Sequence, residues 1–218
     1  MGYLLKRKLL HLFFPTRCPV CGEFIGAMER FCGSCENKLT RYTGSFRIDG
    51  ADSFTAVFEY DDIIKPAVIL LKDGTCGNAA YALGGELADK LNTEGITKDT
   101  DVIVPAPMHR KDVLRRGFNQ SDLIARELAR ILGIPVDTRS VVKIRHTHTQ
   151  KGLDKGGRAV NLRNAFSVSE KLKGKRVLLV DDICTTGSTL REITAAIKKA
   201  GAASVRCACC CKTNSHRD

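Results

Sequence analysis

The sequence predicts an α/β protein, with a parallel sheet flanked by helices and a small cysteine-rich module in front of it. Two C-x-x-C pairs lie within residues 18–35, where there is little apolar periodicity. After about residue 45, strand-like runs alternate with helical patterns, which is typical of a parallel α/β sheet. Residues 177–180 form an uninterrupted apolar run, as expected of a central parallel strand. We therefore divide the chain into residues 1–45 and residues 46–218.

The first half of the larger part has clear element signals. Residues 53–60 alternate apolar and polar side chains and predict a half-buried strand. Pro66 opens a short helix that Gly74 ends. Leucines spaced four apart, at positions 83, 87 and 91, mark one face of the next helix. Residues 101–105 then predict a short buried strand, followed by a basic loop.

The second half continues the alternation. Asn119 or Ser121 caps a helix that Gly133 ends. Residues 141–144 predict a strand, and residues 145–164, which have no clear period, predict a long loop of the kind that usually has a function. A strand over 175–180, a helix over 190–200 and a last strand from Val205 complete the pattern. In that last strand we expect four cysteines, between 207 and 211, to be half-buried.

The 218-residue chain carries a formal charge of +11, which favours polyanionic partners without choosing among them. Residues 1–14 read MGYLLKRKLLHLFF, where the basic triplet from Lys6 to Lys8 argues against a signal peptide. No apolar run is long enough to cross a bilayer, so we expect a cytoplasmic protein. The segment predicts an apolar–basic helix, which either lies on a membrane or partner or packs against its own domain.

The two cysteine pairs predict a structural zinc site. CPVC and CGSC are separated by ten residues, and each pair can hold one tetrahedral ion from a tight turn. The expected ligands are Cys18, Cys21, Cys32 and Cys35. Four sulfurs leave no open position for catalysis, and so small a module needs a metal to fold. A redox dithiol or an accidental arrangement explains two pairs in register less well.

The sharpest motif is VLLVDDICTTGST, residues 177–189. Asp181 and Asp182 end the apolar run, at the sheet edge where open α/β sheets bind ligands. Residues 185–189 form a hydroxyl-rich turn into a helix, whose amides and dipole suit a phosphate. Gly187 permits close approach of the backbone. Two carboxylates beside a phosphate cradle favour a sugar phosphate, because the acids accept hydrogen bonds from a ribose diol.

Other nucleotide motifs are excluded or fit less well. The chain lacks G-x-x-x-x-G-K-[ST], and no G-x-G-x-x-G follows a strand. A paired aspartate also occurs in response-regulator receivers, but only 36 residues follow Asp182, too few for the rest of such a domain.

The motif resembles the phosphoribosyl-pyrophosphate signature of type I phosphoribosyltransferases, and the remaining landmarks resemble the ComF family within them. The matching segments are PAPMHR (105–110), RRGFNQ (115–120), the spaced Gln150, Leu153, Arg158 and Asn161, Ala165-Phe166, and the N-terminal cysteine pairs. The resemblance covers nearly the whole chain. It implies the type I phosphoribosyltransferase fold with a small N-terminal zinc module that has four cysteine ligands.

The resemblance also implies site roles. Asp181 and Asp182 would take the ribose hydroxyls of phosphoribosyl pyrophosphate, and residues 185–189 its 5′-phosphate, with Mg²⁺ accompanying the pyrophosphate. The loop after 101–105 would hold the pyrophosphate, and residues 145–164 would form a hood over the substrate. The implied catalytic residues are Asp181, Asp182, Arg116 and Lys151. The implied substrate-binding residues are Asp181, Asp182, Ile183, Cys184, Thr185, Thr186, Gly187, Ser188, Thr189, His109, Arg110, Arg115, Arg116, Lys72, Gln150, Arg158 and Asn161.

Two functions follow from the resemblance. The first is an enzyme that transfers a phosphoribosyl group to an unknown acceptor, in a role linked to DNA uptake. The second is a non-catalytic protein of transformation that senses phosphoribosyl pyrophosphate or handles single-stranded DNA, with peripheral association to a membrane DNA-uptake apparatus. The basic charge favours DNA, whereas 6% aromatic residues and no tryptophan offer few stacking platforms for bases.

Overall fold

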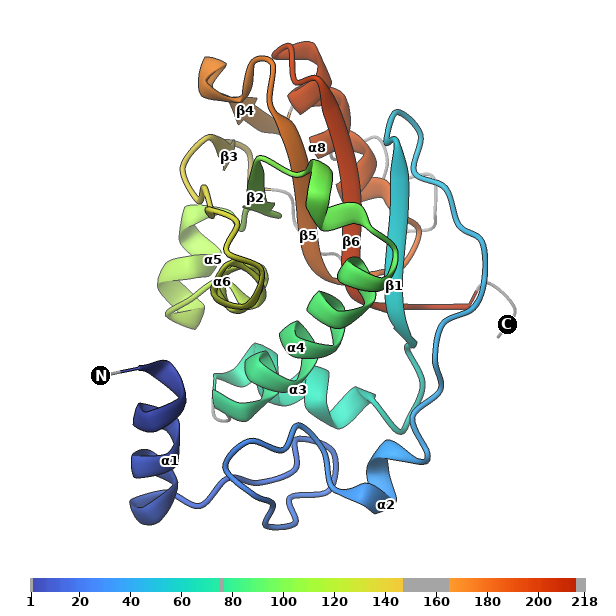
Figure 1. The fold of residues 1–218 in the computed structure, drawn as a ribbon. Helices are drawn as coiled ribbons and strands as arrows, with labels where there is room; N and C mark the ends of the chain where they lie inside the picture. The colour runs from blue at the N-terminus through green and yellow to red at the C-terminus, as the bar shows by residue number, and fades with distance from the viewer. Residues whose placement is uncertain (1, 75–76, 147–164, 215–218) are drawn as a thin grey trace.

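The computed structural model describes residues 2–74, 77–146 and 165–214. Its centre is a parallel sheet with the strand order β1–β6–β5–β2 (Figure 1). These strands are β1 (Ser53–Glu59), β2 (Val102–Pro105), β5 (Arg176–Cys184) and β6 (Ser204–Lys212). A separate antiparallel pair is formed by β3 (Val141–Lys143) and β4 (Phe166–Val168). The predicted parallel sheet is confirmed.

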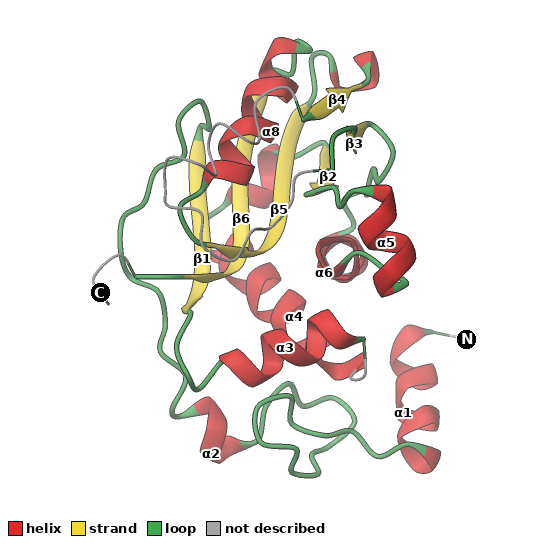
Figure 2. Ribbon diagram, turned by 180° about the vertical axis from the view of Figure 1, so that it is seen from behind, coloured by secondary structure: helices red, strands yellow, loops and turns green. Residues whose placement is uncertain are grey.

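Helices cover both faces of the sheet (Figures 1 and 2). One apolar layer contains side chains of α3 (Lys65–Asp73), α4 (Gly77–Thr93) and α6 (Gln120–Leu132). The other contains side chains of α8 (Ser188–Lys199) and of the short η2 (Glu170–Leu172). Along β5, Leu178 and Val180 face the first layer and Val177 and Leu179 face the second. The sheet therefore separates two cores.

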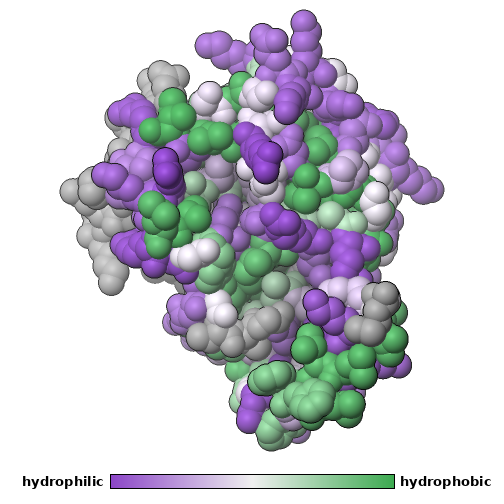
Figure 3. Space-filling view, turned by 90° about the vertical axis from the view of Figure 1, so that its left-hand side faces the viewer, coloured by the Kyte–Doolittle hydropathy of each residue, from purple (hydrophilic) through white to green (hydrophobic). Residues whose placement is uncertain are grey.

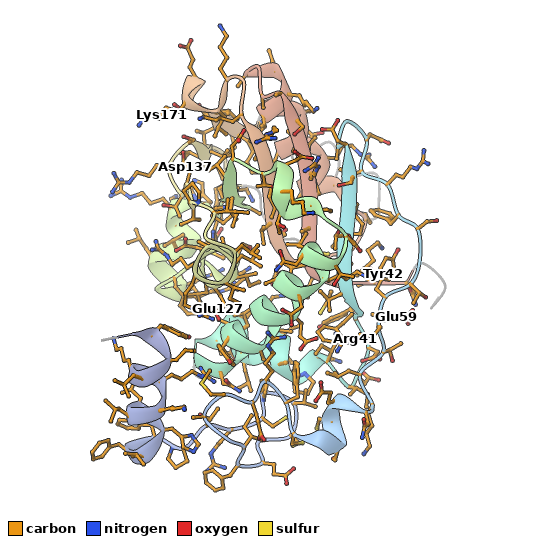
Figure 4. The ribbon with its side chains drawn as sticks, viewed as in Figure 1. Arg41, Tyr42, Glu59, Glu127, Asp137 and Lys171 are labelled. Carbon is orange, nitrogen blue, oxygen red and sulfur yellow. The ribbon has the colours of Figure 1, made fainter. Side chains whose placement is uncertain are left out.

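The residues predicted to begin and end helices are confirmed. Gly74 and Gly133 have φ of 70° and end α3 and α6 in the left-handed conformation that glycine adopts easily. Asn119 caps α6 by accepting a hydrogen bond from the Ser121 amide. Helices α4 and α6 approach closely at Gly84, where a Cβ would lie 2.9 Å from that of Glu127, a side chain labelled in Figure 4.

The segment after β2 differs from the prediction. We expected a basic loop, but residues Arg110–Arg116 form a helix, α5. The His109 ring caps it through Nδ1, which accepts from the Lys111 amide at 3.3 Å, and Gly117 ends it with a φ of 90°. None of its side chains is buried, so the sequence has no apolar stripe to reveal it.

Strand β6 also differs from the prediction. Cys207, Cys209, Cys210 and Cys211 are at most 1% exposed, so the strand is buried on both faces and not on one. The physical reason is the strand's position between β1 and β5, with helices covering both faces.

Both outer edges of the sheet are paired with irregular backbone. On β1, the Tyr42 amide donates to the Val57 carbonyl at 2.8 Å and the Glu59 amide to the Thr40 carbonyl at 2.9 Å. On β2, the Ile103 amide donates to the Pro135 carbonyl at 2.9 Å and Ile103 accepts from the Asp137 amide at 2.8 Å. Figure 4 labels Tyr42 and Glu59 near the end of β1, where the segment that leaves the cysteine-rich module runs beside the strand.

An ion pair joins the starts of β2 and β5. The Arg176 side chain donates to both carboxylate oxygens of Asp101, with Nη2 2.8 Å from Oδ1 and Nε 3.2 Å from Oδ2. The Arg176 amide donates to Oδ2 at 2.8 Å. These hydrogen bonds to Arg176 lower the pKa of Asp101 to about 2. The pair lies at the opposite end of the strands from the paired aspartates.

We expect this ion pair to make stability depend on acid pH. Because the folded pKa of Asp101 lies below its ordinary value of 3.8, the unfolded chain binds more protons between these values. The stabilising contribution is therefore present above about pH 4 and is lost as the pH falls toward 2. Asp101→Asn should lower the free energy of unfolding at pH 6, and its deficit against wild type should shrink by pH 2.5, measured by urea unfolding. Asp73→Asn, at an exposed carboxylate, is the control; a deficit independent of pH would contradict the assignment.

Candidate functional site: a four-cysteine cluster and a polar pocket at the carboxyl edge of the sheet

The four N-terminal cysteines come together as predicted. The Sγ atoms of Cys18, Cys21, Cys32 and Cys35 all lie within 4.8 Å of one another, and those of Cys21 and Cys32 are 3.6 Å apart. Tetrahedral coordination with Zn–S bonds of about 2.3 Å requires sulfurs about 3.8 Å apart. Four thiol ligands at this spacing fit one structural zinc ion, which would fix two chain turns to each other.

The cysteine module packs onto α4. Cys18, Cys32 and Cys35 belong to the same apolar layer as Leu83 and Leu87. The first turns of α4 carry polar anchors, because Asn78 Nδ2 donates to the Arg17 carbonyl at 3.0 Å and Tyr81 donates to that of Met28 at 3.1 Å.

Charged contacts complete the attachment of the module. Glu86 accepts from Arg30 at 3.0 Å and from Arg41 at 2.5 Å. Gly85 leaves room for the first of these, since a Cβ there would lie 2.4 Å from Arg30 Nε. Arg41, labelled in Figure 4, marks the point where the chain leaves the module.

The paired aspartates lie near the carboxyl end of β5. Asp181 Oδ1 accepts from Ser121 Oγ at 2.8 Å and from the Asp182 amide at 2.9 Å. Burial, followed by the neighbouring charge of Asp182, raises the pKa of Asp181 well above that of an ordinary aspartate. Asp182 is 6% exposed, and its Oδ2 lies 3.3 Å from Lys72 Nζ without an aligned hydrogen bond. Both acids thus keep acceptor capacity for a ligand.

The turn after β5 presents unpaired amides. Gly187, with a φ of 74°, precedes α8, and a Cβ there would lie 2.6 Å from Ile48. Thr186 Oγ1 and Ser188 Oγ are 2.7 Å apart. Among the described residues, the Thr185 and Thr186 amides have no hydrogen-bond acceptor, whereas the first amide of α8, that of Ser188, donates to Thr186 Oγ1 at 3.4 Å. Such a set of donors at a helix N-terminus can hold a phosphate.

A pocket of about 260 Å³ is lined by the paired aspartates and by Thr189 in the first turn of α8, while the predicted residues Thr185, Thr186, Gly187 and Ser188 do not line it. It lies between the residues that follow β2, the start of α6 and the end of β5. The lining residues are Ala106, Pro107, Met108, Asp112, Arg115, Arg116, Asn119, Gln120, Ser121, Lys143, Asp181, Asp182 and Thr189. The pocket therefore combines three acids, Thr189 at the start of α8, and the cations of Arg115, Arg116 and Lys143.

The structure brings part of the predicted set to this pocket. Asp181, Asp182, Arg115, Arg116 and Thr189 line it. Lys72 reaches it through its ion pair with Asp182.

Other predicted residues stay away from the pocket. His109 and Arg110 precede or begin α5 and do not line it. Cys184 is 1% exposed and Ile183 packs against the core, and the Cys184 sulfur accepts a hydrogen bond from the Gly187 amide of the turn. Gln150, Lys151, Arg158 and Asn161 lie outside the described residues.

Eight of the lining residues were not predicted as site residues, and two of these, Ser121 and Lys143, carry polar groups that bear on Asp181. Ser121, 1% exposed, holds Asp181, and its position in the first turn of α6 was the available signal. Lys143 comes from β3, and burial lowers its pKa while the charges of Asp112 and Asp181 oppose that shift. A lone lysine in a short strand has no sequence pattern that marks it.

Comparison with known proteins agrees with this architecture. Residues 77–218 match the profile of the phosphoribosyl transferase domain, and residues 9–46 match that of the double zinc ribbon domain. The larger part of the chain is thus a phosphoribosyl transferase domain. The zinc ribbon match and the cysteine cluster together support structural zinc.

Curated relatives show to which family the chain belongs. It is 33% identical to the DNA utilization protein YhgH of Escherichia coli (strain K12), over 91% of this chain and 85% of that one. It is 32% identical to competence protein F of Haemophilus influenzae, over 88% of each chain. The chain therefore belongs to the ComF family, whose named members are competence and DNA utilization proteins. A solved purine phosphoribosyltransferase from Pyrococcus horikoshii shares 25% identity and a TM-score of 0.38, covering 60% of this chain and 71% of that one.

Among the described residues, no helix has the length and apolar character needed to cross a membrane.

We expect the purified protein to contain one zinc ion per chain, measured by elemental analysis. Cys35→Ala should lose that zinc. Because the ligands share a core with α4, we expect the unfolding midpoint to fall by at least about 6 °C, the shift that about 3 kcal/mol produces at this chain length. Cys207→Ala, a buried cysteine outside the cluster, is the matched control and should keep its zinc. Full zinc content in Cys35→Ala would contradict the site.

Proposed function

We propose that the pocket binds phosphoribosyl pyrophosphate with Mg²⁺ and that the protein transfers the phosphoribosyl group to an acceptor. The observation that supports this most is the position of Asp181 and Asp182 beside the free amides that precede α8. A ribose diol donates hydrogen bonds to carboxylates, and a 5′-phosphate accepts them from amides. One ligand that carries both groups could thus use the acceptors and the donors that lie at the same edge of the sheet.

The pocket's charges suit the reaction. Transfer breaks the bond between the anomeric carbon and pyrophosphate, forms a bond to the acceptor and leaves pyrophosphate as an anion. Arg115, Arg116 and Lys143 line the pocket and would neutralise the leaving group, a role that is most effective in a water-poor site. Ser121 would hold Asp181 in place for the ribose. Lys151, outside the described residues, keeps its proposed catalytic role.

Carboxylate oxygens such as those of Asp181 and Asp182 are donors that Mg²⁺ accepts. When bound with the substrate, the ion would add positive charge beside the pyrophosphate oxygens.

The names of the relatives suggest the cellular process in which the protein acts. Because the relatives are named for competence and DNA utilization, we propose that the activity serves DNA uptake and that single-stranded DNA is a partner. The charge of +11 supports a polyanionic partner. Under the alternative function, the pocket senses phosphoribosyl pyrophosphate without turnover. We also propose a cytoplasmic protein divided at residues 45 and 46.

We expect calorimetric titration to detect binding of phosphoribosyl pyrophosphate in the presence of Mg²⁺. The double variant Asp181→Asn, Asp182→Asn should weaken binding at least tenfold, because each substitution replaces a carboxyl oxygen that can accept from a ribose hydroxyl by an amide NH₂ that can only donate, and a lost hydrogen bond costs about 0.5–1.5 kcal/mol or more. Asp122→Asn, an acid on the neighbouring α6 that pairs with Arg126, is the matched control and should bind as wild type does.

Undiminished binding by the double variant would contradict the ribose assignment. Pyrophosphate release on adding candidate acceptors separates transfer from sensing, since sensing predicts binding without release.

Helix α1 (Tyr3–Phe13) favours a second property, docking on an anionic membrane surface. Its protein-facing side is polar: Arg7 donates to Asn78 and to the Ala27 carbonyl and lies 3.6 Å from the Tyr81 ring centroid. At about 100° per residue, Leu5, Leu9 and Leu12 fall on the opposite face.

That opposite face is apolar and exposed. Leu12 and Phe13 are 73% and 78% exposed, and Figure 3 shows apolar side chains gathered over this end of the molecule. Lys6 and Lys8 lie on either side of the apolar stripe, where their ammonium groups can reach headgroups while the stripe inserts. Like charges on a second copy of the helix would repel, so a lipid surface fits better than self-association.

We expect the protein to sediment with vesicles that contain phosphatidylglycerol and much less with phosphatidylcholine vesicles. Leu12→Gln, Phe13→Gln should weaken that binding about tenfold, because two apolar side chains no longer insert. Leu114→Gln, at a leucine 74% exposed on α5, is the matched control and should bind normally. Equal binding by the α1 variant, or light scattering that shows dimers without lipid, would contradict the proposal.

A further inference from the structure

Lys212 is a buried cation behind the turn that follows β5. It is the last residue of β6, pairs in register with Cys184 and is 2% exposed. Its Nζ donates to the Thr185 carbonyl at 2.9 Å and to the Thr213 carbonyl at 2.6 Å, and it lies 4.3 Å from the Phe46 ring centroid. Glu59 of β1 is its partner in register on the other side, but within residues 2–74, 77–146 and 165–214 no carboxylate, that of Glu59 included, forms an ion pair with it.

The absence of an acidic partner needs an explanation. A buried ammonium loses most of its hydration, and two carbonyls with an aromatic face replace only part of it. Buried charges are normally paired with an opposite charge. The charge of Lys212 also acts on a neighbouring thiol. A hydrogen bond with Cys209 and, after it, the positive charge of Lys212 lower the pKa of Cys184. An anion bound at the turn would be the missing counter-charge.

The contact with Thr185 also sets the direction of an amide. Among the described residues every peptide bond is trans, so a carbonyl and the following N–H point in opposite directions. Lys212 holds the Thr185 carbonyl toward the protein interior, which directs the Thr186 N–H away from it. That N–H has no acceptor among the described residues.

The turn is supported from the same side by apolar packing. Gly187 lies against Ile48 and Phe46, since a Cβ at this position would be 2.6 Å from the first and 3.1 Å from the second. Phe46 therefore contacts both the lysine and the turn. Lys212 and Phe46 together hold the turn at its inner surface, and the outer surface keeps its donors for a ligand.

We propose that Lys212 is a positioning residue for the ligand's 5′-phosphate, which it serves by orienting the Thr186 amide and by supplying a buried counter-charge. The inference rests on the proposed function, because the phosphate belongs to phosphoribosyl pyrophosphate. Lys212 does not touch the ligand and acts through the turn. The pyrophosphate group, held near Arg115 and Arg116, lies outside its influence.

The test compares two fragments of the ligand by calorimetry on the full zinc-loaded chain. Ribose 5-phosphate reports on the turn, and magnesium pyrophosphate reports on the cationic side of the pocket. Lys212→Met, of similar length without charge, should weaken ribose 5-phosphate and phosphoribosyl pyrophosphate at least tenfold and leave pyrophosphate within twofold. Lys212→Arg should recover binding to within about threefold of wild type. Lys98→Met, at an exposed lysine on η1 (Ile96–Asp99), is the matched control.

Each outcome has a distinct meaning. Unchanged affinity of Lys212→Met for ribose 5-phosphate would overturn the role of Lys212 and leave the proposed function standing. Equal weakening of both fragments would also overturn it, because that pattern shows a general structural loss. Wild-type protein that binds neither phosphoribosyl pyrophosphate nor ribose 5-phosphate would overturn both proposals.

A measurement on wild type alone covers the case in which Lys212→Met does not fold. In ¹H–¹⁵N spectra, ribose 5-phosphate should shift the Thr186 amide downfield, as a new hydrogen bond to phosphate does, and by more than the amides near Arg116. A Thr186 amide that stays in place on saturation would overturn the inference.

Discussion

The parallel pairing of β5 with both of its neighbours is the constraint on which the site depends. Parallel strands have their carboxyl ends at the same edge of the sheet, so the segments that follow β2, β5 and β6 all begin at that edge. The register ends with Pro105 beside Val180, so Ala106, directly after β2, comes next to Asp181 within β5, and the β5–β6 register sets Lys212 beside Cys184. Acids, cations and the start of a helix thus meet without any long side chain having to reach across the sheet.

The zinc ribbon is part of the same physical unit as the sheet. Its cysteines share an apolar layer with α4, and Glu86 accepts from both Arg30 and Arg41. The chain that leaves it runs along β1 and places Phe46 and Ile48 under Gly187 (Figure 1). The segment that follows the module therefore packs beneath the turn beside the pocket.

Sequence patterns were sufficient where one physical rule dominates. Apolar runs, glycine ends and the Asn119 cap located β5, α3 and α6, and cysteine spacing located the metal cluster. They were insufficient where the environment comes from distant segments. Helix α5 buries nothing, so no stripe marked it. Lys143 and Lys212 became notable only once the fold showed the first beside the pocket and the second buried.

The two covered edges of the sheet have a consequence for assembly. Strand addition between molecules needs an open row of backbone donors and acceptors. Residues 40–42 occupy part of that row on β1 and residues 135–137 occupy part of it on β2, each through a single bridge rather than a further strand. The four-stranded sheet, with four cysteines in one central strand, is thereby shielded at both outer strands from the pairing that would let one molecule add its edge to another.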